Sequence, residues 1–182
     1  MHILFVCSGN ICRSPMGELL MKRYLQSTNI FVSSAGTIGL PSHPIAAHSA
    51  EMLNLVNIDS SAFRSRRLTK QIAESADLIL CYEKKHCAAV SQLAPAKMRQ
   101  TFLLPDFANL CQYCSQAGML DRYYTVESRI RAVIASAFTV RPMVSVAEDI
   151  PDPVGKDRQA FYQAARSTNF ALKQIMTSIA KQ

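Results

Sequence analysis

The sequence of 182 residues contains no apolar stretch long enough to cross a bilayer. It also shows no internal repeat and no low-complexity tract. The apolar start, residues 2–7, is short, lacks a basic leader and is followed at once by polar residues, so we expect no secretory signal peptide. A chain of this length is long enough for one domain with a sizeable core, and we expect residues 1–182 to form a single domain.

Charged residues are scarce, at 18% of the sequence against 49% hydrophobic residues, a balance typical of a folded, soluble protein. The net charge of +7 favours acidic partners, such as phosphorylated protein, nucleic acid or anionic lipid. The positive charge is dispersed, and its densest cluster is FRSRRLTK (63–70), which we interpret as a solvated face. No aromatic residues interleave with a long basic tract, so neither nucleic-acid binding nor membrane insertion is expected.

Cysteines are present in an even number, but the core is expected to be large enough to make a disulfide framework unnecessary. We therefore expect a reducing compartment, the cytoplasm, with thiols kept for chemistry or packing. CQYC (111–114) is a lone Cys-x-x-Cys pair, compatible with half a zinc site, with a redox pair or with two buried thiols, and we favour the last interpretation. The six cysteines are Cys7, Cys12, Cys81, Cys87, Cys111 and Cys114.

Short apolar runs alternate with amphipathic segments along the chain. This alternation predicts an α/β fold in which a four-stranded parallel sheet carries helices on both faces. Strands are expected at residues 2–7, 30–36, 77–82 and 99–105. Helices are expected at residues 15–27, 43–55, 68–76 (with Thr69 as a possible cap), 83–94 and 157–181.

Residues 108–147 fit this alternation less well, because they are too long and too patterned for a simple loop. They contain CQYC and then a segment with apolar residues on one side of a possible helix. We interpret the segment as an inserted subdomain or lid placed before an acidic loop, EDIPDPVG (148–155).

The stretch CSGNICRS (7–14) lies between the first strand and the first helix, at the edge of a parallel sheet where ligands bind. The backbone N–H groups of such a loop, over a helix N-terminus, form a cradle for phosphate. Arg13 adds a planar guanidinium that binds two phosphate oxygens, and Cys7 is the candidate nucleophile. Gly9 is expected to permit a backbone geometry that a side chain would obstruct. Asn10 is expected to hold the loop.

An acid is also needed to protonate the leaving oxygen. Asp152 lies between two prolines in the stiffened loop EDIPDPVG, and we interpret it as the general acid. Asp149 is interpreted as a structural hydrogen-bonding residue or cap. Ser14 is placed to donate its hydroxyl proton to the Cys7 sulfur, and neither a metal nor a cofactor is expected.

VCSGNICRSPMGE (6–18) closely resembles the signature of the low-molecular-weight protein tyrosine phosphatases. The resemblance extends through most of the chain apart from residues 108–147, in SSAGT (33–37), PSHPIAAHSAEML (41–53), FRSRRLT (63–69), DLIL (77–80), LLPDF (103–107) and DIPDP (149–153). It implies a four-stranded parallel sheet flanked by helices, and hydrolysis of phosphotyrosine in proteins or peptides through a phosphocysteine intermediate.

The resemblance also assigns roles to single residues. It implies Cys7 as nucleophile, Arg13 as phosphate binder and Asp152 as general acid, with Cys12 as a redox partner that pairs with the nucleophile under oxidation. Related bacterial enzymes that dephosphorylate arginine carry threonine where this chain has Ile11, so isoleucine favours phosphotyrosine. The phosphate-binding and supporting residues of the loop are then Ser8, Gly9, Asn10, Ile11, Cys12 and Ser14.

Three departures from the family pattern stand beside this match. Val154 follows the Asp-Pro pair where the family often has an aromatic residue, which Tyr123 or Tyr124 would have to supply. Phe63 replaces a usual histidine, and Tyr82-Glu83 (82–83) replaces a common Met-Asp. Two other functions remain open: a thioredoxin-coupled arsenate reductase that would use Cys81 and Cys87, and a phosphoprotein-binding module with weak catalysis.

Overall fold

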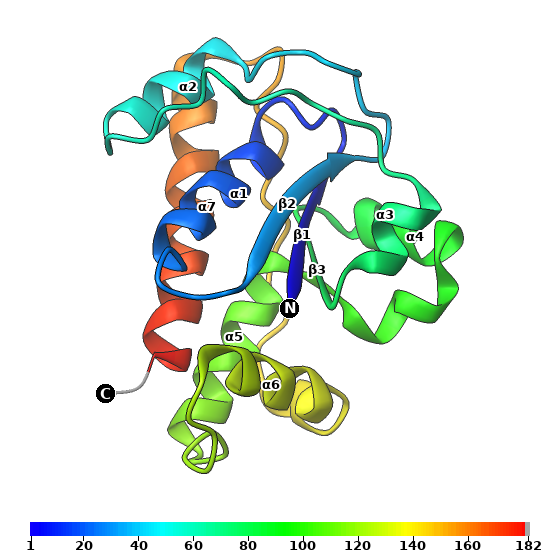
Figure 1. Cartoon of the computed structure of the whole chain (residues 1–182), viewed down its shortest axis with the longest axis vertical. Helices are drawn as coiled ribbons and strands as arrows, with labels where there is room; N and C mark the ends of the chain where they lie inside the picture. Colours follow the sequence, from blue (N-terminus) through cyan, green and yellow to red (C-terminus); the bar gives the residue numbers. More distant parts are fainter. Residues whose placement is uncertain (181–182) are drawn as a thin grey trace.

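The computed structural model describes residues 1–180 of the chain. Four parallel strands form one sheet in the order β2-β1-β3-β4, with β1 and β3 at its centre (Figure 1). The strands are β1 (His2–Cys7), β2 (Phe31–Gly36), β3 (Leu78–Cys81) and β4 (Thr101–Leu103). All three pairings are parallel, which confirms the predicted fold class and places the carboxyl ends of the strands at one edge.

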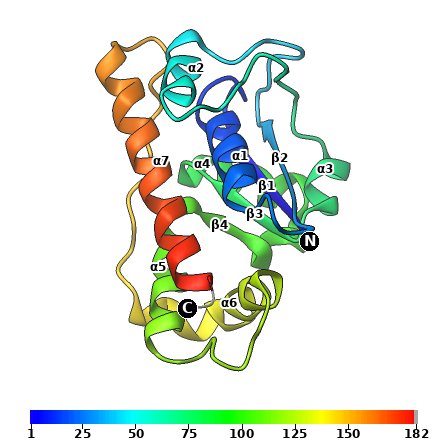
Figure 2. The ribbon, with the colours of Figure 1, turned by 60° about the vertical axis from the view of Figure 1, so that its left-hand side comes forward.

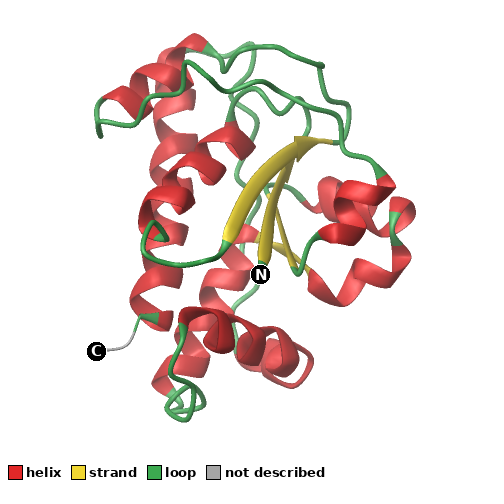
Figure 3. Cartoon of the chain, in the orientation of Figure 1, coloured by secondary structure: helices red, strands yellow, loops and turns green. Residues whose placement is uncertain are grey.

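Helices cover both faces of the sheet (Figure 3). No helix within residues 1–180 is both long and apolar enough to cross a membrane. The α-helices are α1 (Arg13–Tyr24), α2 (Ala47–Asn54), α3 (Lys70–Ser75), α4 (Lys84–Leu93), α5 (Leu104–Gln116), α6 (Val126–Val140) and α7 (Arg158–Ile179), with 3-10 turns η1 (Pro95–Gln100) and η2 (Arg141–Met143).

The side chains of β1 alternate between two apolar cores, because successive residues of a strand point to opposite faces. Ile3, Phe5 and Cys7 lie in the larger core, with residues of α1, α5 and α7. Leu4 and Val6 lie in the smaller core, against residues of α3 and α4. A central strand buried on both faces reads as a continuous apolar run, which is what HILFVC shows.

Several element boundaries differ from the sequence predictions by a turn or less. Helix α1 begins at Arg13, so that Pro15 lies in its first turn, where proline is tolerated. LLPDF (103–107) is mainly the start of α5, because β4 ends at Leu103 and Pro105 again lies in the first turn. The predicted cap of α3 is confirmed, since the Thr69 side chain accepts a hydrogen bond from the backbone N–H of Ile72.

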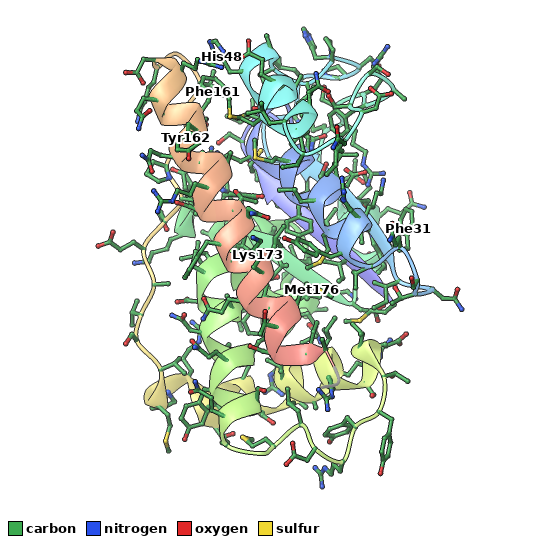
Figure 4. The ribbon with its side chains drawn as sticks, turned by 90° about the vertical axis from the view of Figure 1, so that its left-hand side faces the viewer. Phe31, His48, Phe161, Tyr162, Lys173 and Met176 are labelled. Carbon is green, nitrogen blue, oxygen red and sulfur yellow. The ribbon has the colours of Figure 1, made fainter. Side chains whose placement is uncertain are left out.

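The last helix also follows its prediction. Helix α7 begins after Asp157, whose side chain accepts from the backbone N–H of Ala160. Residue 181, the end of the predicted helix, lies outside the described residues. The first turns of α7 pack on α2, where the rings of Phe161 and His48 meet with centroids 5.1 Å apart (Figure 4).

Helix α5 begins where β4 ends and runs away from the carboxyl edge of the sheet, so that its later turns and α6 lie at the opposite end of the molecule (Figure 1). Leu110, Cys111, Ile130 and Val133 are fully or almost fully buried in the same core as Phe5. Residues 108–147, interpreted from the sequence as an inserted subdomain or lid, thus contribute side chains of α5 and α6 to the main core. The apolar side of α6 that suggested an insertion is the side that completes this core.

A long irregular segment, residues 144–157, leads from η2 back along the molecule to the start of α7 (Figure 2). The side chain of Asn109 on α5 donates to the carbonyl of Ser145, and the backbone N–H of Ala147 donates to the Asp106 carboxylate. At the far end, the backbone N–H of Ile150 donates to the carbonyl of Tyr82, which follows β3. These contacts carry the acidic loop to the carboxyl edge of the sheet.

Candidate active site

The backbone carbonyl groups of the loop between β1 and α1, residues 8–12, accept hydrogen bonds from the segment that follows β2. Backbone N–H groups of residues 37–40 donate to the carbonyls of Cys7, Ser8 and Gly9, and the N–H of Ala46 donates to that of Ile11 at 2.7 Å. In contrast, no backbone N–H group of residues 8–12 donates to another residue in the described chain. The loop therefore presents a set of free donors at the N-terminus of α1, which is an arrangement that binds anions.

Asn10 holds this loop from inside, as the sequence predicted. Its backbone is in the left-handed region, with φ of 56°, which asparagine tolerates better than most residues. The side-chain amide donates to the hydroxyls of Ser14 (2.9 Å) and Ser34 (2.8 Å), and its oxygen accepts from the backbone N–H of Arg66 at 2.8 Å. The buried amide thus ties the loop to the start of α1, to β2 and to the segment before α3.

The glycine that the loop requires is Gly36 rather than Gly9. Gly9 does not have a positive φ, and a Cβ atom there would meet only the Ile11 side chain, at 3.4 Å. A Cβ atom on Gly36 would lie 2.5 Å from the carbonyl oxygen of Ser8 and 2.9 Å from the backbone nitrogen of Asn10. Strand β2 can approach the loop this closely only because it ends in glycine.

Cys7 and Ser14 lie side by side at the base of the loop. The Cys7 sulfur is 3.0 Å from the Ser14 hydroxyl oxygen, and both side chains are buried. The Ser14 oxygen accepts a hydrogen bond from Asn10, and its own proton has two acceptors within reach, the Cys7 sulfur at 3.0 Å and the more distant carbonyl of Ala35 at 3.5 Å. This contact and the start of α1 both favour negative charge on the sulfur.

Hydrogen bonds fix one nitrogen of the Arg13 guanidinium, Nη1, whereas the other two nitrogens make none. Its Nη1 donates to the Glu83 carboxylate at 2.7 Å and to the carbonyl of Ile150 at 2.8 Å. Nε and Nη2 have no hydrogen-bond partner within residues 1–180, although the side chain is only 1% exposed. Buried donors without acceptors are costly, so this edge of the guanidinium is suited to a ligand with two oxygens.

Asp152 reaches the same guanidinium. Its Oδ2 lies 2.6 Å from Arg13 Nη2, in a direction that makes the contact an ion pair rather than a hydrogen bond. Its Oδ1 accepts from the backbone N–H of Val154 at 3.2 Å, which fixes the turn after Pro153. Asp149 instead accepts from the backbone N–H of Lys84 at the start of α4, so its interpretation as a structural cap is confirmed.

Cys12 is buried against α2, where its sulfur accepts a hydrogen bond from the Ser49 hydroxyl at 2.9 Å. Burial raises the pKa of this thiol to about 12, so Cys12 stays protonated at neutral pH. Both Cys7 and Cys12 are free thiols. The predicted residues Ser8, Asn10, Arg13 and Ser14 are brought together around Cys7, and Ile11 is half-buried in the same loop.

Sequence reasoning missed the residues that support the loop from other elements. Glu83 and His86 come from the start of α4, Ser34 from β2 and Ser49 from α2. Arg66 was interpreted as part of a solvated face, yet its backbone binds Asn10 and its side chain donates to the carbonyl of Ser34. Only Glu83 and His86 left a sequence signal, the i, i+3 spacing of a capping box.

The remaining candidates lie away from the loop. Tyr123 and Tyr124 come just before α6, at the opposite end of the molecule, and do not supply the missing aromatic wall (Figure 1). Cys111 and Cys114 are fully buried in the larger core, which agrees with the interpretation of two packed thiols. Within residues 1–180, no group of three or more His, Cys, Asp or Glu side chains is arranged to hold a metal ion.

Cys81 and Cys87 belong to the other side of the sheet from Cys7. Cys81 is paired in register with Val6 and lies in the smaller core, whereas Cys7 points into the larger one. Cys87 packs against that smaller core. A disulfide relay from Cys7 to Cys81 would have to pass through the sheet, so the arrangement does not favour the reductase alternative.

A sequence model of the family described as low molecular weight phosphotyrosine protein phosphatase matches residues 2–140. The chain belongs to this family. The low molecular weight protein-tyrosine-phosphatase Etp of Escherichia coli (strain K12) is 41% identical over 101 residues, which are 56% of this chain and 67% of Etp. The protein-arginine-phosphatase of Bacillus subtilis (strain 168) is 34% identical over 109 residues, 59% of this chain and 72% of that protein.

The fold is shared with solved members of the phosphatase family. The structure of Vibrio vulnificus Wzb in complex with benzylphosphonate matches with a TM-score of 0.70 and 26% identity, covering 97% of each chain. The family match along the sequence includes the loop after β1 and ends at residue 140. Asp152 lies beyond this match, so its proposed role rests on the resemblance of DIPDP (149–153) and on its contact with Arg13.

Proposed function

We propose that this chain hydrolyses phosphotyrosine in proteins, without a metal, through a phosphocysteine intermediate. Membership of the phosphatase family and the names of relatives such as Etp support this activity. The observation that carries it is the unfilled set of donors around one thiol. The backbone N–H groups of residues 8–12 donate to no residue of the described chain, and Nε and Nη2 of the buried Arg13 make no hydrogen bond there, although Nη2 forms an ion pair with Asp152.

In the first step, a phosphate monoester enters the loop with its oxygens on the backbone N–H groups and on Arg13. The Cys7 sulfur attacks phosphorus, so that an S–P bond forms while the bond between phosphorus and the leaving oxygen breaks. Asp152 donates its proton to that oxygen, which leaves as an alcohol or a phenol. The ion pair between Asp152 and Arg13 places the carboxylate at the mouth of the loop before the phosphate enters. When the phosphate displaces it from Arg13, Asp152 takes up from the solvent the proton that it then donates.

In the second step, water hydrolyses the phosphocysteine. Asp152, now a carboxylate, takes a proton from the water as its oxygen attacks phosphorus, and the S–P bond breaks. Sulfur leaves with the electron pair of that bond, and the neighbouring Ser14 hydroxyl stabilises the charge that develops on it. Inorganic phosphate is released, and Cys7 and Asp152 return to their starting states.

Tyrosine is the proposed phosphorylated residue, although one relative is named a protein-arginine-phosphatase. Ile11 supports this choice, because the resemblance associates threonine at this position with arginine phosphatases. The substrates would be phosphoproteins or phosphopeptides, which the net charge of +7 attracts. We place the activity in the cytoplasm, and the six free cysteines support a reducing compartment.

Hydrolysis of p-nitrophenyl phosphate, with a reductant and EDTA, tests this function in the wild type and in Cys7→Ser. We expect turnover in the wild type that EDTA does not change, and a loss of at least about a thousandfold in the variant, since the serine hydroxyl is not ionised at neutral pH. Turnover that survives Cys7→Ser would overturn the proposal. A phosphotyrosine peptide and a phosphoarginine peptide, compared at equal concentration, then test the residue preference.

A further inference from the structure

The first turn of α4 contacts both loops of the site. The Glu83 carboxylate accepts from Arg13 Nη1 at 2.7 Å, and His86 Nε2 lies 2.9 Å from the Ser8 hydroxyl. Lys84 binds Asp149 in the acidic loop through its backbone N–H. One helical turn, which follows the third strand, therefore holds the phosphate loop and the acidic loop together.

Glu83 and His86 also form the capping box of α4. The Glu83 backbone carbonyl accepts from the backbone N–H of His86 at 2.9 Å, and His86 Nδ1 accepts from the backbone N–H of Glu83 at 3.1 Å. A capping box satisfies two backbone donors at a helix start, and its side chains usually face solvent. Here both are buried or nearly so, with His86 only 1% exposed, and both also bind the phosphate loop.

The hydrogen bonds of His86 define its protonation. Because Nδ1 accepts from a backbone N–H, the neutral ring carries its proton on Nε2 and donates it to the Ser8 hydroxyl. Burial, and then the positive charge of Arg13, lower the pKa of His86 to about 4, so the ring is neutral at pH 7. The ring thereby fixes Ser8, the residue next to Cys7.

Glu83 determines which edge of the Arg13 guanidinium is open. By occupying Nη1 together with the Ile150 carbonyl, it leaves Nε and Nη2 as the pair of donors that faces the loop. Without this contact the guanidinium is free to rotate about its bonds and to pair more fully with Asp152. A guanidinium binds a phosphate through two parallel hydrogen bonds only when its plane is fixed.

We propose that Glu83 and His86 are positioning residues for phosphoryl transfer, with Glu83 orienting Arg13 and His86 orienting Ser8. This inference rests on the proposed function, and it adds that catalysis depends on two side chains at the start of α4. Neither residue touches the phosphate; both act through a residue of the loop. Small errors in the placement of reacting groups cost large factors in rate, so the loss of either contact lowers catalysis more than stability alone explains.

Glu83→Ala and Glu83→Gln test the contact with Arg13, and Thr125→Ala is the matched control. Thr125 belongs to the capping box of α6, at the opposite end of the molecule, so its loss removes a cap without touching the site. The measurements are kcat and KM for p-nitrophenyl phosphate, the Ki of inorganic phosphate, and Tm. We expect Glu83→Ala to lower kcat/KM at least about tenfold and to weaken phosphate inhibition, with Glu83→Gln between it and the wild type.

For His86, the variants are His86→Gln, Ser8→Ala and the two combined. Glutamine at the third helical position can still cap the helix. Ser8→Ala removes the hydroxyl that contacts His86 but changes no residue of α4. We expect each single change to lower kcat/KM several-fold and the double change to be no worse than the more severe single one. Purely additive effects would show that His86 does not act through Ser8.

The outcomes separate this inference from the proposed function. If the wild type turns over substrate and Cys7→Ser does not, the phosphatase function stands whatever Glu83 and His86 do. The positioning role is overturned if Glu83→Ala matches Thr125→Ala in kcat/KM and in Ki. If the wild type shows no turnover, calorimetric titration with inorganic phosphate still decides, because Glu83→Ala must then bind phosphate at least about tenfold more weakly than Thr125→Ala.

Discussion

The Oδ2 atom of Asp152 lies 2.6 Å from Nη2 of Arg13, so the proposed acid and the proposed phosphate binder form an ion pair. A phosphate that takes up Nη2 must compete with Asp152 for it. The displaced Asp152 then takes up a proton, which it donates to the leaving oxygen. Arg13 and Asp152 are therefore already in place at the site, but their ion pair must break before phosphate can bind Nη2.

Asp152→Asn should slow poor leaving groups far more than good ones, because asparagine supplies no proton to the departing oxygen. For phenyl phosphate we expect kcat to fall by about 10² to 10⁴, the usual contribution of general acid catalysis. For p-nitrophenyl phosphate, whose phenolate leaves readily, the fall should be much smaller. Steady-state kinetics with both esters check this, and an equal loss for both would remove Asp152 from the acid role.

Gly36→Ala should damage the loop, whereas Gly9→Ala should leave stability nearly unchanged. The added methyl group on Gly36 meets backbone atoms of Ser8 and Asn10, which cannot move aside as a flexible side chain can. Overpacking of this kind costs about 1–3 kcal/mol of unfolding free energy. Urea unfolding of the two variants checks the difference, and comparable losses in both would contradict the assignment of the critical glycine to residue 36.

Cys12 should make the oxidation of Cys7 reversible, as the family resemblance implies. Hydrogen peroxide oxidises the Cys7 thiolate to a sulfenic acid and is itself reduced, releasing hydroxide. The Cys12 thiol then attacks the sulfenic sulfur, so that a Cys7–Cys12 disulfide forms and water leaves. Wild type treated with peroxide should regain most of its activity with dithiothreitol, and Cys12→Ser should regain much less. Equal recovery in both proteins would show that Cys12 does not protect the nucleophile.

His86 should make folding stability depend on pH between about 4 and 6.5. Burial lowers its pKa in the folded state to about 4, so in this window the unfolded chain binds more protons and stability falls as pH falls. The charged groups that act on the ring are Arg13, Glu83, Lys85 and Asp152.

The size of this effect is measured as a difference between two proteins. Between pH 7 and pH 5 the contribution of His86 to the unfolding free energy should decrease by roughly 2 kcal/mol. Urea unfolding of wild type and His86→Gln at both values isolates it from the carboxylates, which titrate in both proteins. If the two proteins lost the same stability on acidification, His86 would not be held neutral by the fold.

Local patterns in the sequence predicted the sheet, its helices and the loop around Cys7, because CSGNICRS carries nucleophile, phosphate binder and support within eight residues. Contacts between residues that lie far apart in the sequence could not be predicted from these local patterns. Nothing near Glu83 in sequence shows that Arg13 will lie beside it, since 70 residues separate them. The need for glycine at residue 36 arises only where β2 meets the loop.

The segment of residues 108–147 shows a different limit. Its apolar positions indicated a helix, and α6 is that helix, but periodicity does not say which surface an apolar side will cover. The aromatic pair Tyr123 and Tyr124 was likewise considered for the substrate cleft on chemistry alone. The structure leaves both at the far end of the molecule, where α5 and α6 close the core.

The distance along the chain between the two halves of the site has a consequence for biosynthesis. Arg13 leaves the ribosome 137 residues before Ile150, whose carbonyl holds it. A nascent chain can thus carry the cysteine loop for most of its synthesis without the acid that completes turnover. Catalytic competence is acquired only when residues 149–153 reach the edge of the sheet and bind Tyr82, Lys84 and Arg13 there.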